Sequence, residues 1–232
     1  MSLPLFLVPS LEVSVLDGPE GHHAADVARL RVGESLLLSD GRGGMACAVV
    51  AAVGRGRLEL STHQRWYVPP PAPRLVVAQG IAKGDRGELA VQVMTEVGVD
   101  EIVPWTAARS VARWKDDRPL ERWRATAREA AKQARRAWLP VVSPPVSTPV
   151  LAARVTFVLE SSADVRLSTV DIPATAAEIV LVVGPEGGVA PEELSAFTAA
   201  GAVPVRLGDT VLRTSTAGVA ALSVLNGRLG RW

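Results

Sequence analysis

The sequence is poor in the residues from which many enzymes build reactive centres. Its 232 residues include one cysteine, Cys47, and three histidines. A single cysteine cannot form an internal disulfide bond, and three histidines do not supply the ligand cluster of a zinc site. There is no G-x-S-x-G nucleophile motif, and the carboxylates near the glycine turns described below have no histidine close in sequence. We therefore expect no disulfide, no metal and no nucleophilic triad, and we expect Cys47 to be a small core residue.

Long apolar segments are also lacking. Residues 3–9 are too short and too uncharged for a signal peptide, and no apolar run reaches the roughly 18 residues of a membrane span. The hydrophobic content of 48% is nevertheless sufficient for a buried core at this length. These features predict a globular, cytoplasmic protein without a membrane segment.

Two glycine turns stand out near the C-terminus. In residues 181–194, LVVGPEGGVAPEEL, an apolar run is followed by Gly187 and Gly188, and then by Pro191 and two acids that are typical of a first helical turn. Residues 205–222, VRLGDTVLRTSTAGVAAL, repeat the order of strand, turn and helix. Such glycines either serve tight geometry alone or let a ligand approach the backbone. Neither turn matches GxGxxG or GxxxxGK[ST], so the pair predicts a pocket built mostly from backbone and not a phosphate loop.

Positive charge is concentrated in one segment. Residues 109–138 contain ten Lys or Arg residues and four acids, a net charge of +6, whereas the whole chain has a net charge of +1. This asymmetry is typical of a surface that binds a polyanion, but a solvated helix face would give the same pattern. Charge alone leaves both interpretations open.

The first part of the chain, residues 1–68, has the pattern of a small β-barrel. Short strands separated by glycine turns are expected at residues 11–16, 35–39, 45–53 and 57–60. The proline-rich sequence YVPPPAP at residues 67–73 can join neither a sheet nor a helix, so residues 69–73 are expected to be a linker.

The second part, residues 74–232, alternates strands and helices. Strands are expected at 74–80, 101–105, 156–159, 179–183 and 202–207, and helices at 87–97, 119–138, from 191 onward and at 214–229. In the first of these helices, Leu89, Val93 and Val97 share one face. Alternation of this kind predicts an α/β domain with a parallel sheet.

Several blocks of sequence resemble a known family. They are GPEGG followed by PEE, LGDTVLRTSTA with its alanine-rich helix, His22-His23 with RVGESLLLSDGRG, KGDRGELAVQVMTEVGVDEIVPWTAARS, and ERWRATAREAAKQARRAWLPVV. Together they cover nearly the whole chain and resemble the RsmE family of 16S rRNA uracil-N3 methyltransferases in the SPOUT superfamily. That family commonly has Glu in LRTETA where this chain has Ser215, so a role that depends on that carboxylate does not carry over.

The resemblance implies a fold, a cofactor and partners. It implies a SPOUT-type parallel sheet with a C-terminal trefoil knot in residues 74–232 and a PUA-like, RNA-binding β-barrel in residues 1–68. It also implies S-adenosylmethionine as cofactor, 16S rRNA of the small ribosomal subunit as partner, and a homodimer. The implied cofactor-binding residues are Leu159, Glu160, Ser161, Val183, Gly184, Pro185, Gly187, Gly188, Leu207, Gly208, Val211, Leu212 and Thr214.

Catalytic and RNA-binding residues can also be named. Because the uracil N3–H must lose its proton, a nearby cation would stabilise the developing anion, and Arg213 is the candidate. Glu186 is expected either to accept the proton or to orient the loop. The residues expected to contact RNA are His22, His23, Arg109, Arg113, Arg128, Lys132 and Arg135.

Two alternative functions remain open at this stage. One is a SPOUT methyltransferase that modifies another rRNA or tRNA position, such as a ribose hydroxyl. The other is a non-catalytic RNA-binding factor for ribosome assembly, which the barrel and the basic segment would support equally well.

Overall fold

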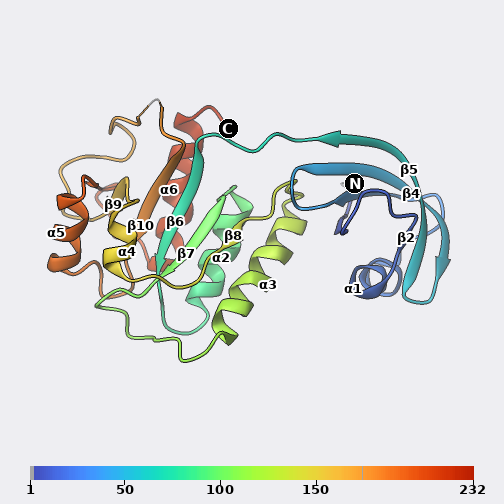
Figure 1. Cartoon of the computed structure of the whole chain (residues 1–232), viewed down its shortest axis with the longest axis horizontal. Coiled ribbons are helices and arrows are strands. Elements are labelled where there is room, and N and C mark those ends of the chain that lie inside the picture. The colour runs from blue at the N-terminus through green and yellow to red at the C-terminus, as the bar shows by residue number, and fades with distance from the viewer. Residues whose placement is uncertain (1–2, 174) are drawn as a thin grey trace. The chain divides into compact units, whose positions relative to one another are not determined.

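The structure is a computed structural model that describes residues 3–173 and 175–232. The chain divides into two compact units: residues up to 70 together with 131–139, and residues 71–130 together with 140–232 (Figure 1). The sequence indicated the change of architecture near residue 70, but it gave no sign that a later stretch belongs to the first unit.

The first unit is a five-stranded sheet with a short helical segment. Its strands are β1 (Leu5–Leu7), β2 (Val15–Leu16), β3 (Ser35–Ser39), β4 (Gly44–Gly54) and β5 (Arg57–Tyr67), in the order β1-β3-β4-β5-β2. The helical segment consists of α1 (Gly18–His22) and the π-helix η1 (His23–Val27). The alternating residues Leu36 and Leu38 of β3 are fully buried together with Phe6 and Leu58, which gives this unit its own core.

Residues 131–139 complete the first unit. The backbone N–H of Leu139 donates to the carbonyl of Gly41 at 3.1 Å, and the N–H of Gly43 donates to the carbonyl of Ala137 at 2.9 Å. Ala137 and Leu139 also pack against a small buried cluster on β1 and β4. The first unit therefore depends on backbone and apolar contacts from a stretch more than sixty residues further along the chain.

Several expectations for the first unit were wrong in detail. The expected strand 11–16 is reduced to β2, and β1 was not expected, because it is short and its only strand partner is the distant β3, to which it runs parallel. The helical segment that contains the two histidines begins at Gly18, with Pro19 in its first turn. Cys47 lies at a register shift of the β4 and β5 pairing and is only partly buried, so it is not a full core residue.

The second unit is a parallel sheet covered by helices on both faces. Its strands are β6 (Arg74–Gly80), β7 (Glu101–Trp105), β8 (Val141–Val142), β9 (Phe157–Leu159), β10 (Glu178–Val183) and β11 (Val203–Val205), in the order β11-β9-β10-β6-β7-β8. Its helices are α2 (Arg86–Glu96), α3 (Arg118–Gln133, whose last residues count with the first unit), α4 (Thr148–Ala152), α5 (Pro191–Ala199) and α6 (Thr214–Arg228).

Two apolar cores lie on opposite faces of this sheet. One contains residues of α2, α3 and α6, and the other contains residues of α4 and α5 (Figure 1). The central strands β6 and β10 are buried almost throughout, as expected for parallel strands covered on both sides. The predicted α/β fold with a parallel sheet is confirmed.

Two helices of this unit differ from expectation. The buried face of α2 carries Ala90, Val91 and Met94, whereas Leu89 is 45% exposed, because the small residues of α2 pack against α6 and α3. Helix α3 ends at Gln133 and not at 138, since Arg135 adopts a left-handed conformation that stops the helix.

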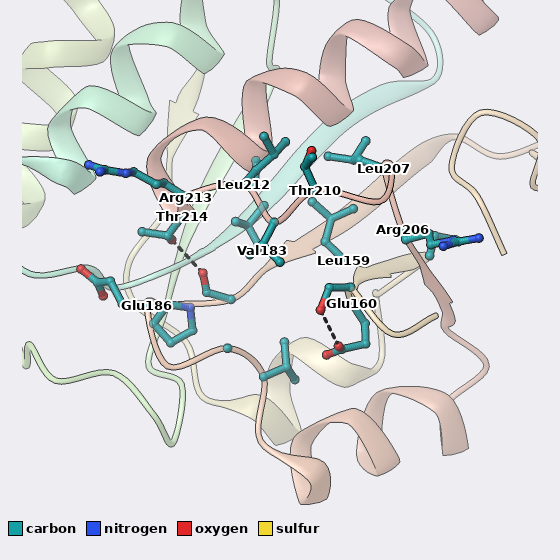
Figure 2. Close-up of a pocket in the computed structure, with 18 of the residues that line it drawn as sticks. Leu159, Glu160, Val183, Glu186, Arg206, Leu207, Thr210, Leu212, Arg213 and Thr214 are labelled. Atoms are coloured by element: carbon teal, nitrogen blue, oxygen red, sulfur yellow. Dashed lines mark hydrogen bonds between the residues drawn. The ribbon is translucent and has the colours of Figure 1, made fainter. Parts of the chain in front are cut away.

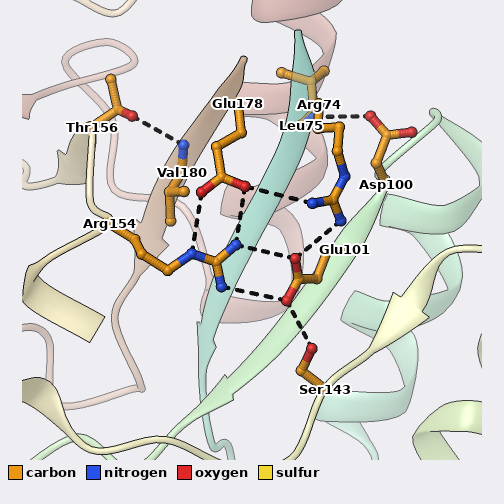
Figure 3. A network of polar contacts seen from close by, with 9 residues as sticks. All are labelled: Arg74, Leu75, Asp100, Glu101, Ser143, Arg154, Thr156, Glu178 and Val180. Atoms are coloured by element: carbon orange, nitrogen blue, oxygen red, sulfur yellow. Dashed lines mark hydrogen bonds and ion pairs between the residues drawn. The ribbon is translucent and has the colours of Figure 1, made fainter. Parts of the chain in front are cut away.

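A network of charged residues joins the first residues of three strands (Figure 3). Glu101 on β7 is 7% exposed, and its carboxylate accepts hydrogen bonds from Arg154 and Arg74, both at 3.1 Å, and from Ser143 at 2.7 Å. Arg154 also pairs with Glu178 at 3.0 Å. Burial alone would raise the pKa of Glu101, but the hydrogen bonds from Arg154 and Ser143 and the charges of both arginines outweigh it and lower the pKa from its ordinary value.

This network gives a prediction about stability. Glu101→Gln should lower the free energy of unfolding by about 1–3 kcal/mol at pH 7, because Arg74 and Arg154 lose the more buried of the two anions that they share and keep only Glu178. Because the pKa of Glu101 is lower in the folded than in the unfolded protein, its carboxylate stabilises the fold fully above the pKa of the unfolded state. This stabilisation is lost as the pH falls through the pKa of the folded state. Urea unfolding should therefore show a full difference at neutral pH that shrinks as the pH falls below the ordinary range of a glutamate pKa. The exposed Glu192→Gln is the control, and a difference that does not change with pH would contradict the prediction.

Candidate functional site

Three loops at the carboxyl ends of β9, β10 and β11 enclose a pocket of about 480 Å³ (Figure 2). The strand order places β9 between β10 and β11, so the three strand ends are adjacent. Ligands of parallel α/β sheets bind at this edge, where loops diverge from neighbouring strands. The pocket is lined by Arg86, Leu159, Glu160, Ser161, Val183, Gly184, Pro185, Glu186, Gly188, Val189, Val205, Arg206, Leu207, Gly208, Thr210, Val211, Leu212, Arg213, Thr214 and Ala217.

The structure brings the expected cofactor-binding residues together in this pocket, with one difference. All of them line it except Gly187, and both Arg213 and Glu186 line it as well. A Cβ on Gly187 would lie 2.9 Å from the Cβ of Arg109, so this glycine makes room for a neighbouring loop and not for a ligand. The lining residues that the sequence did not suggest are mostly neighbours of expected ones; Arg86, at the start of α2, comes from a separate segment.

Two glycines at the pocket serve different purposes. Gly188 has a φ of +73°, a left-handed conformation that favours glycine in a tight turn. Gly208 has no left-handed φ, and a Cβ there would meet no protein atom within 4 Å. Gly208 therefore leaves space open beside the pocket, as a close approach of a ligand to the backbone would require.

The start of α6 is held against two strands by a buried hydrogen-bond chain. The fully buried Gln79 of β6 donates from Nε2 to Thr214 Oγ1 at 2.9 Å, and Thr214 Oγ1 donates to the carbonyl of Gly184 at 2.7 Å, the bond drawn in Figure 2. Because Arg213 directly precedes Thr214, this chain fixes the backbone from which the arginine extends. The sequence did not suggest Gln79, since it lies 135 residues from its partner.

A second buried group anchors the glycine loop of residues 184–190. The carboxylate of Glu193 is 7% exposed and accepts hydrogen bonds from Ala108 N–H at 2.8 Å, Thr148 Oγ1 at 2.8 Å and Ala190 N–H at 3.2 Å. Glu193 thus joins the first turn of α5 to the loop after β7 and to α4. A buried carboxylate with three donors is well satisfied, and it makes the loop rigid.

Glu186 is held by cationic and backbone donors. Its Oε1 accepts from Arg86 at 3.0 Å and from the backbone N–H of Lys83 at 3.1 Å. Partial burial would raise its pKa, but hydrogen bonds from its own backbone N–H, from Lys83 and from Arg86 outweigh it and lower the pKa. A carboxylate of lowered pKa is a weak proton acceptor, so this arrangement favours the loop-orienting role that the sequence left open.

Arg213 lies at the N-cap of α6 and its side chain is exposed at the pocket (Figure 2). Within residues 3–173 and 175–232 its guanidinium makes no hydrogen bond or ion pair. Asp209, an obvious partner in sequence, pairs instead with Arg206 at 3.0 Å and Arg166 at 3.6 Å. Ser215 is 4% exposed and does not line the pocket. The pocket therefore presents a cation that is available to a substrate.

Comparison with known proteins decides the family. A family model described as an RNA methyltransferase domain matches residues 69–226, and one described as an RNA methyltransferase PUA domain matches residues 16–62. The chain belongs to the RNA methyltransferase family. The expected resemblance is thereby confirmed for both parts of the chain.

The relatives of this RNA methyltransferase are similar over their full length. The ribosomal RNA small subunit methyltransferase E of Mycobacterium bovis is 48% identical, with 98% of this chain and 93% of the relative covered. The crystal structure of the enzyme of that name from Neisseria gonorrhoeae, bound to S-adenosyl methionine, is 26% identical, covers 98% of both chains and has a TM-score of 0.87. A methyltransferase of Legionella pneumophila in complex with S-adenosylmethionine is 26% identical, with 98% of both chains covered and a TM-score of 0.86.

Among the residues of the methyltransferase domain that were expected to contact RNA, one holds a loop and two are exposed. Arg109 donates to the carbonyl oxygens of Gly187 at 3.2 Å and Val189 at 3.4 Å, so it holds the glycine loop. Arg113 and Arg128 are exposed, the former in the loop before α3 and the latter on α3. The basic segment is therefore not one uniform solvated face.

The remaining expected RNA contacts lie in the first unit. His22 is exposed, with Nδ1 2.8 Å from Asp26, and the ring of His23 packs edge-on against Phe6. The expectation that Lys132 is a surface contact was wrong: it is 6% exposed and pairs with Glu20 at 3.1 Å. Lys132 lies in the last part of α3, which counts with the first unit, and there it contacts Glu20 of α1, which explains the burial.

In the described part of the chain, no group of three or more His, Cys, Asp or Glu side chains is placed to hold a metal ion. None of the described helices is long and apolar enough to cross a membrane.

Proposed function

We propose that this protein transfers the methyl group of S-adenosylmethionine to N3 of a uridine in the 16S rRNA of the small ribosomal subunit. The full-length relatives named ribosomal RNA small subunit methyltransferase E support the substrate class. The observation that carries the proposal is the pocket formed by the ends of three parallel strands, with an unpaired arginine, Arg213, at its edge.

The pocket suits S-adenosylmethionine in its size and lining. The open space at Gly208, the turn at Gly188 and the apolar side chains of Leu159, Val183 and Leu207 form a cradle in which backbone groups meet a ligand. These loops would hold the cofactor. When bound, the cofactor supplies a methyl group already activated on a sulfonium, so the protein needs no nucleophile of its own.

The protein's contribution to the reaction is positioning and electrostatic stabilisation. The uracil N3 gives its proton to solvent water as it attacks, and the negative charge that develops spreads to the ring carbonyl oxygens. Arg213, fixed at its backbone by the bonds of Thr214 and free at its guanidinium, stabilises that charge. Glu186 and Glu193 keep the glycine loop in place and do not take part in proton transfer in this proposal.

The assembly is part of the same proposal. The resemblance to the SPOUT superfamily supports a trefoil knot formed by the three pocket loops and a homodimer. Among the residues that line the pocket, Val211 is 82% exposed and Leu212 is 39% exposed, as expected for apolar side chains that meet a second subunit. Sedimentation equilibrium tests the dimer, and a monomer at micromolar concentration would contradict it.

Mapping of 16S rRNA from a deletion strain, and from the same strain complemented with the wild-type gene, tests the reaction. N3 lies on the pairing edge of uracil, so its methylation stops reverse transcription, whereas a ribose methyl group leaves that edge free. We expect one uridine stop that is absent in the deletion strain and returns with the wild-type gene. A lost ribose methyl group would favour a different methylation position, and unchanged methylation with defective subunits would favour an assembly factor.

A further inference from the structure

Two arginines of the first unit adopt an unusual backbone conformation. Among the described residues other than glycine, Arg29 and Arg135 are those with positive φ, at 55° and 52°. Each follows a helix: Leu30 N–H returns to the carbonyl of Ala24 at 3.0 Å, and Arg136 N–H returns to that of Ala131 at 2.9 Å. This is the helix-ending position at which glycine is usual, since a Cβ makes the conformation costly. Arginine at both positions therefore opposes local preference.

Both helix ends border the same hollow, of about 290 Å³. Its lining includes Phe6, His23, Ala28, Lys132, Gln133 and Arg135, all within the first unit. Arg135 lines this cavity, and Arg29 directly follows the lining residue Ala28, so the backbones of both strained arginines lie at one cavity although they are about a hundred residues apart in sequence. Strain that recurs at one concave place points to a function at that place.

The charge of this hollow is positive. Lys132 is buried and paired with Glu20, whose side chain is 13% exposed. Arg29 and Arg135 are both exposed, and the part of the chain that the structure describes offers their guanidinium groups no hydrogen bond or ion pair. Among the described residues that line the hollow, none has an acidic side chain.

We propose that this hollow binds a phosphate group of the RNA backbone, and that Arg29 and Arg135 occupy strained positions because their guanidinium groups hold that phosphate. The planar fork of arginine matches phosphate in a bidentate way that lysine does not. The hollow, of about 290 Å³, is large enough for one such group. The proposal rests on the proposed function only in taking RNA as the substrate.

Arg135→Gly tests this idea because it separates strain from binding. Glycine relieves the left-handed conformation, so the melting temperature should stay the same or rise by about 2–4 °C. Affinity for a transcript of small-subunit rRNA should fall about tenfold at low salt, and the slope of log K against log salt should decrease by about 1. Arg65→Ala removes one arginine from β5, which contributes no residue to the hollow, and should leave the slope unchanged.

Two further variants keep the test decisive if Arg135→Gly folds poorly. Arg135→Asn removes the charge but tolerates the left-handed conformation, and should lose affinity as the glycine variant does. Arg135→Lys keeps the charge and should retain part of the affinity. Unchanged RNA affinity in Arg135→Gly and Arg135→Asn, or an equal loss in Arg65→Ala, would overturn the proposal.

Inorganic phosphate and the cofactor separate the remaining outcomes. If the hollow binds an RNA phosphate, inorganic phosphate at constant ionic strength should compete with RNA more strongly in the wild-type protein than in Arg135→Gly. Equal competition in the two proteins would mean that the hollow takes free phosphate and not RNA, and would overturn the RNA assignment. Affinity for S-adenosylmethionine without RNA should not change in these variants. An absence of methyl transfer together with an RNA affinity that depends on Arg135 would contradict the proposed function but support the phosphate site.

Discussion

Gly208→Val is expected to weaken the binding of S-adenosylmethionine by about a hundredfold. A Cβ at this position would meet no protein atom within 4 Å, and Gly208 has no left-handed φ, so the valine side chain would extend into the space that the cofactor takes. Filling a site that fits its ligand costs about 1–3 kcal/mol, which is roughly one to two orders of magnitude in affinity. Isothermal titration calorimetry measures the effect directly.

Gly227→Val is the matched control. This glycine near the end of α6 also has open space around it and no left-handed φ, but it does not line the pocket. It should bind the cofactor like the wild type, with equal or greater stability, because valine is the better helix former. Gly188 is the less informative position, since its φ of +73° makes any side chain strained. If folded Gly208→Val binds the cofactor with wild-type affinity, the cofactor does not bind in this pocket.

Arg213→Ala is expected to lower the single-turnover rate of methyl transfer by about 10²–10³, or roughly 3–4 kcal/mol of transition-state stabilisation. The reason is that Arg213 presents an unpaired guanidinium at the pocket, where negative charge develops on the uracil. Cofactor affinity and folding should be preserved, because Thr214 and Gln79 hold the start of α6 without it. Rapid-quench kinetics at saturating rRNA measures the chemical step.

Companion variants assign the role of Arg213. Arg213→Lys should recover part of the rate, because an ammonium keeps the charge but not the planar fork. Arg113→Ala, which removes an exposed arginine from a different loop, should change the rRNA concentration needed for saturation and not the saturated rate. If the rate of Arg213→Ala recovers at high pH, the arginine chiefly eases loss of the N3 proton. A wild-type rate at all pH values would exclude Arg213 from the reaction.

Local patterns in the sequence predicted many of the elements. The strands at 35–39, 74–80 and 101–105 were placed with their observed bounds, because apolar runs bounded by turn residues are a local signal. The bounds of β1 and β2 were not predictable in the same way, since both are very short and each depends on pairing with a distant strand. Non-local contacts of this kind leave no mark within a window of neighbouring residues.

The candidate site, like the fold, was predictable from the sequence where its signals are local. The glycine turns and their flanking residues identified the pocket, because that signal lies in two continuous stretches. The groups that hold those stretches in place, such as Gln79 and Glu193, were not predictable, because their partners are many residues away. The charge pattern was the least reliable guide, since it could not separate the buried Lys132 from the exposed Arg113.

The interrupted make-up of the first unit has a consequence for synthesis on the ribosome. Folding during translation usually proceeds from the N-terminus, one domain after another. Here the sheet of residues 5–67 lacks its contacts to Ala137 and Leu139 until that later stretch has emerged, by which time β6 and α2 are already outside the exit tunnel. The nascent N-terminal sheet must therefore wait, incompletely covered, for about seventy further residues. A fragment cut at the proline-rich linker would remain in that unfinished state.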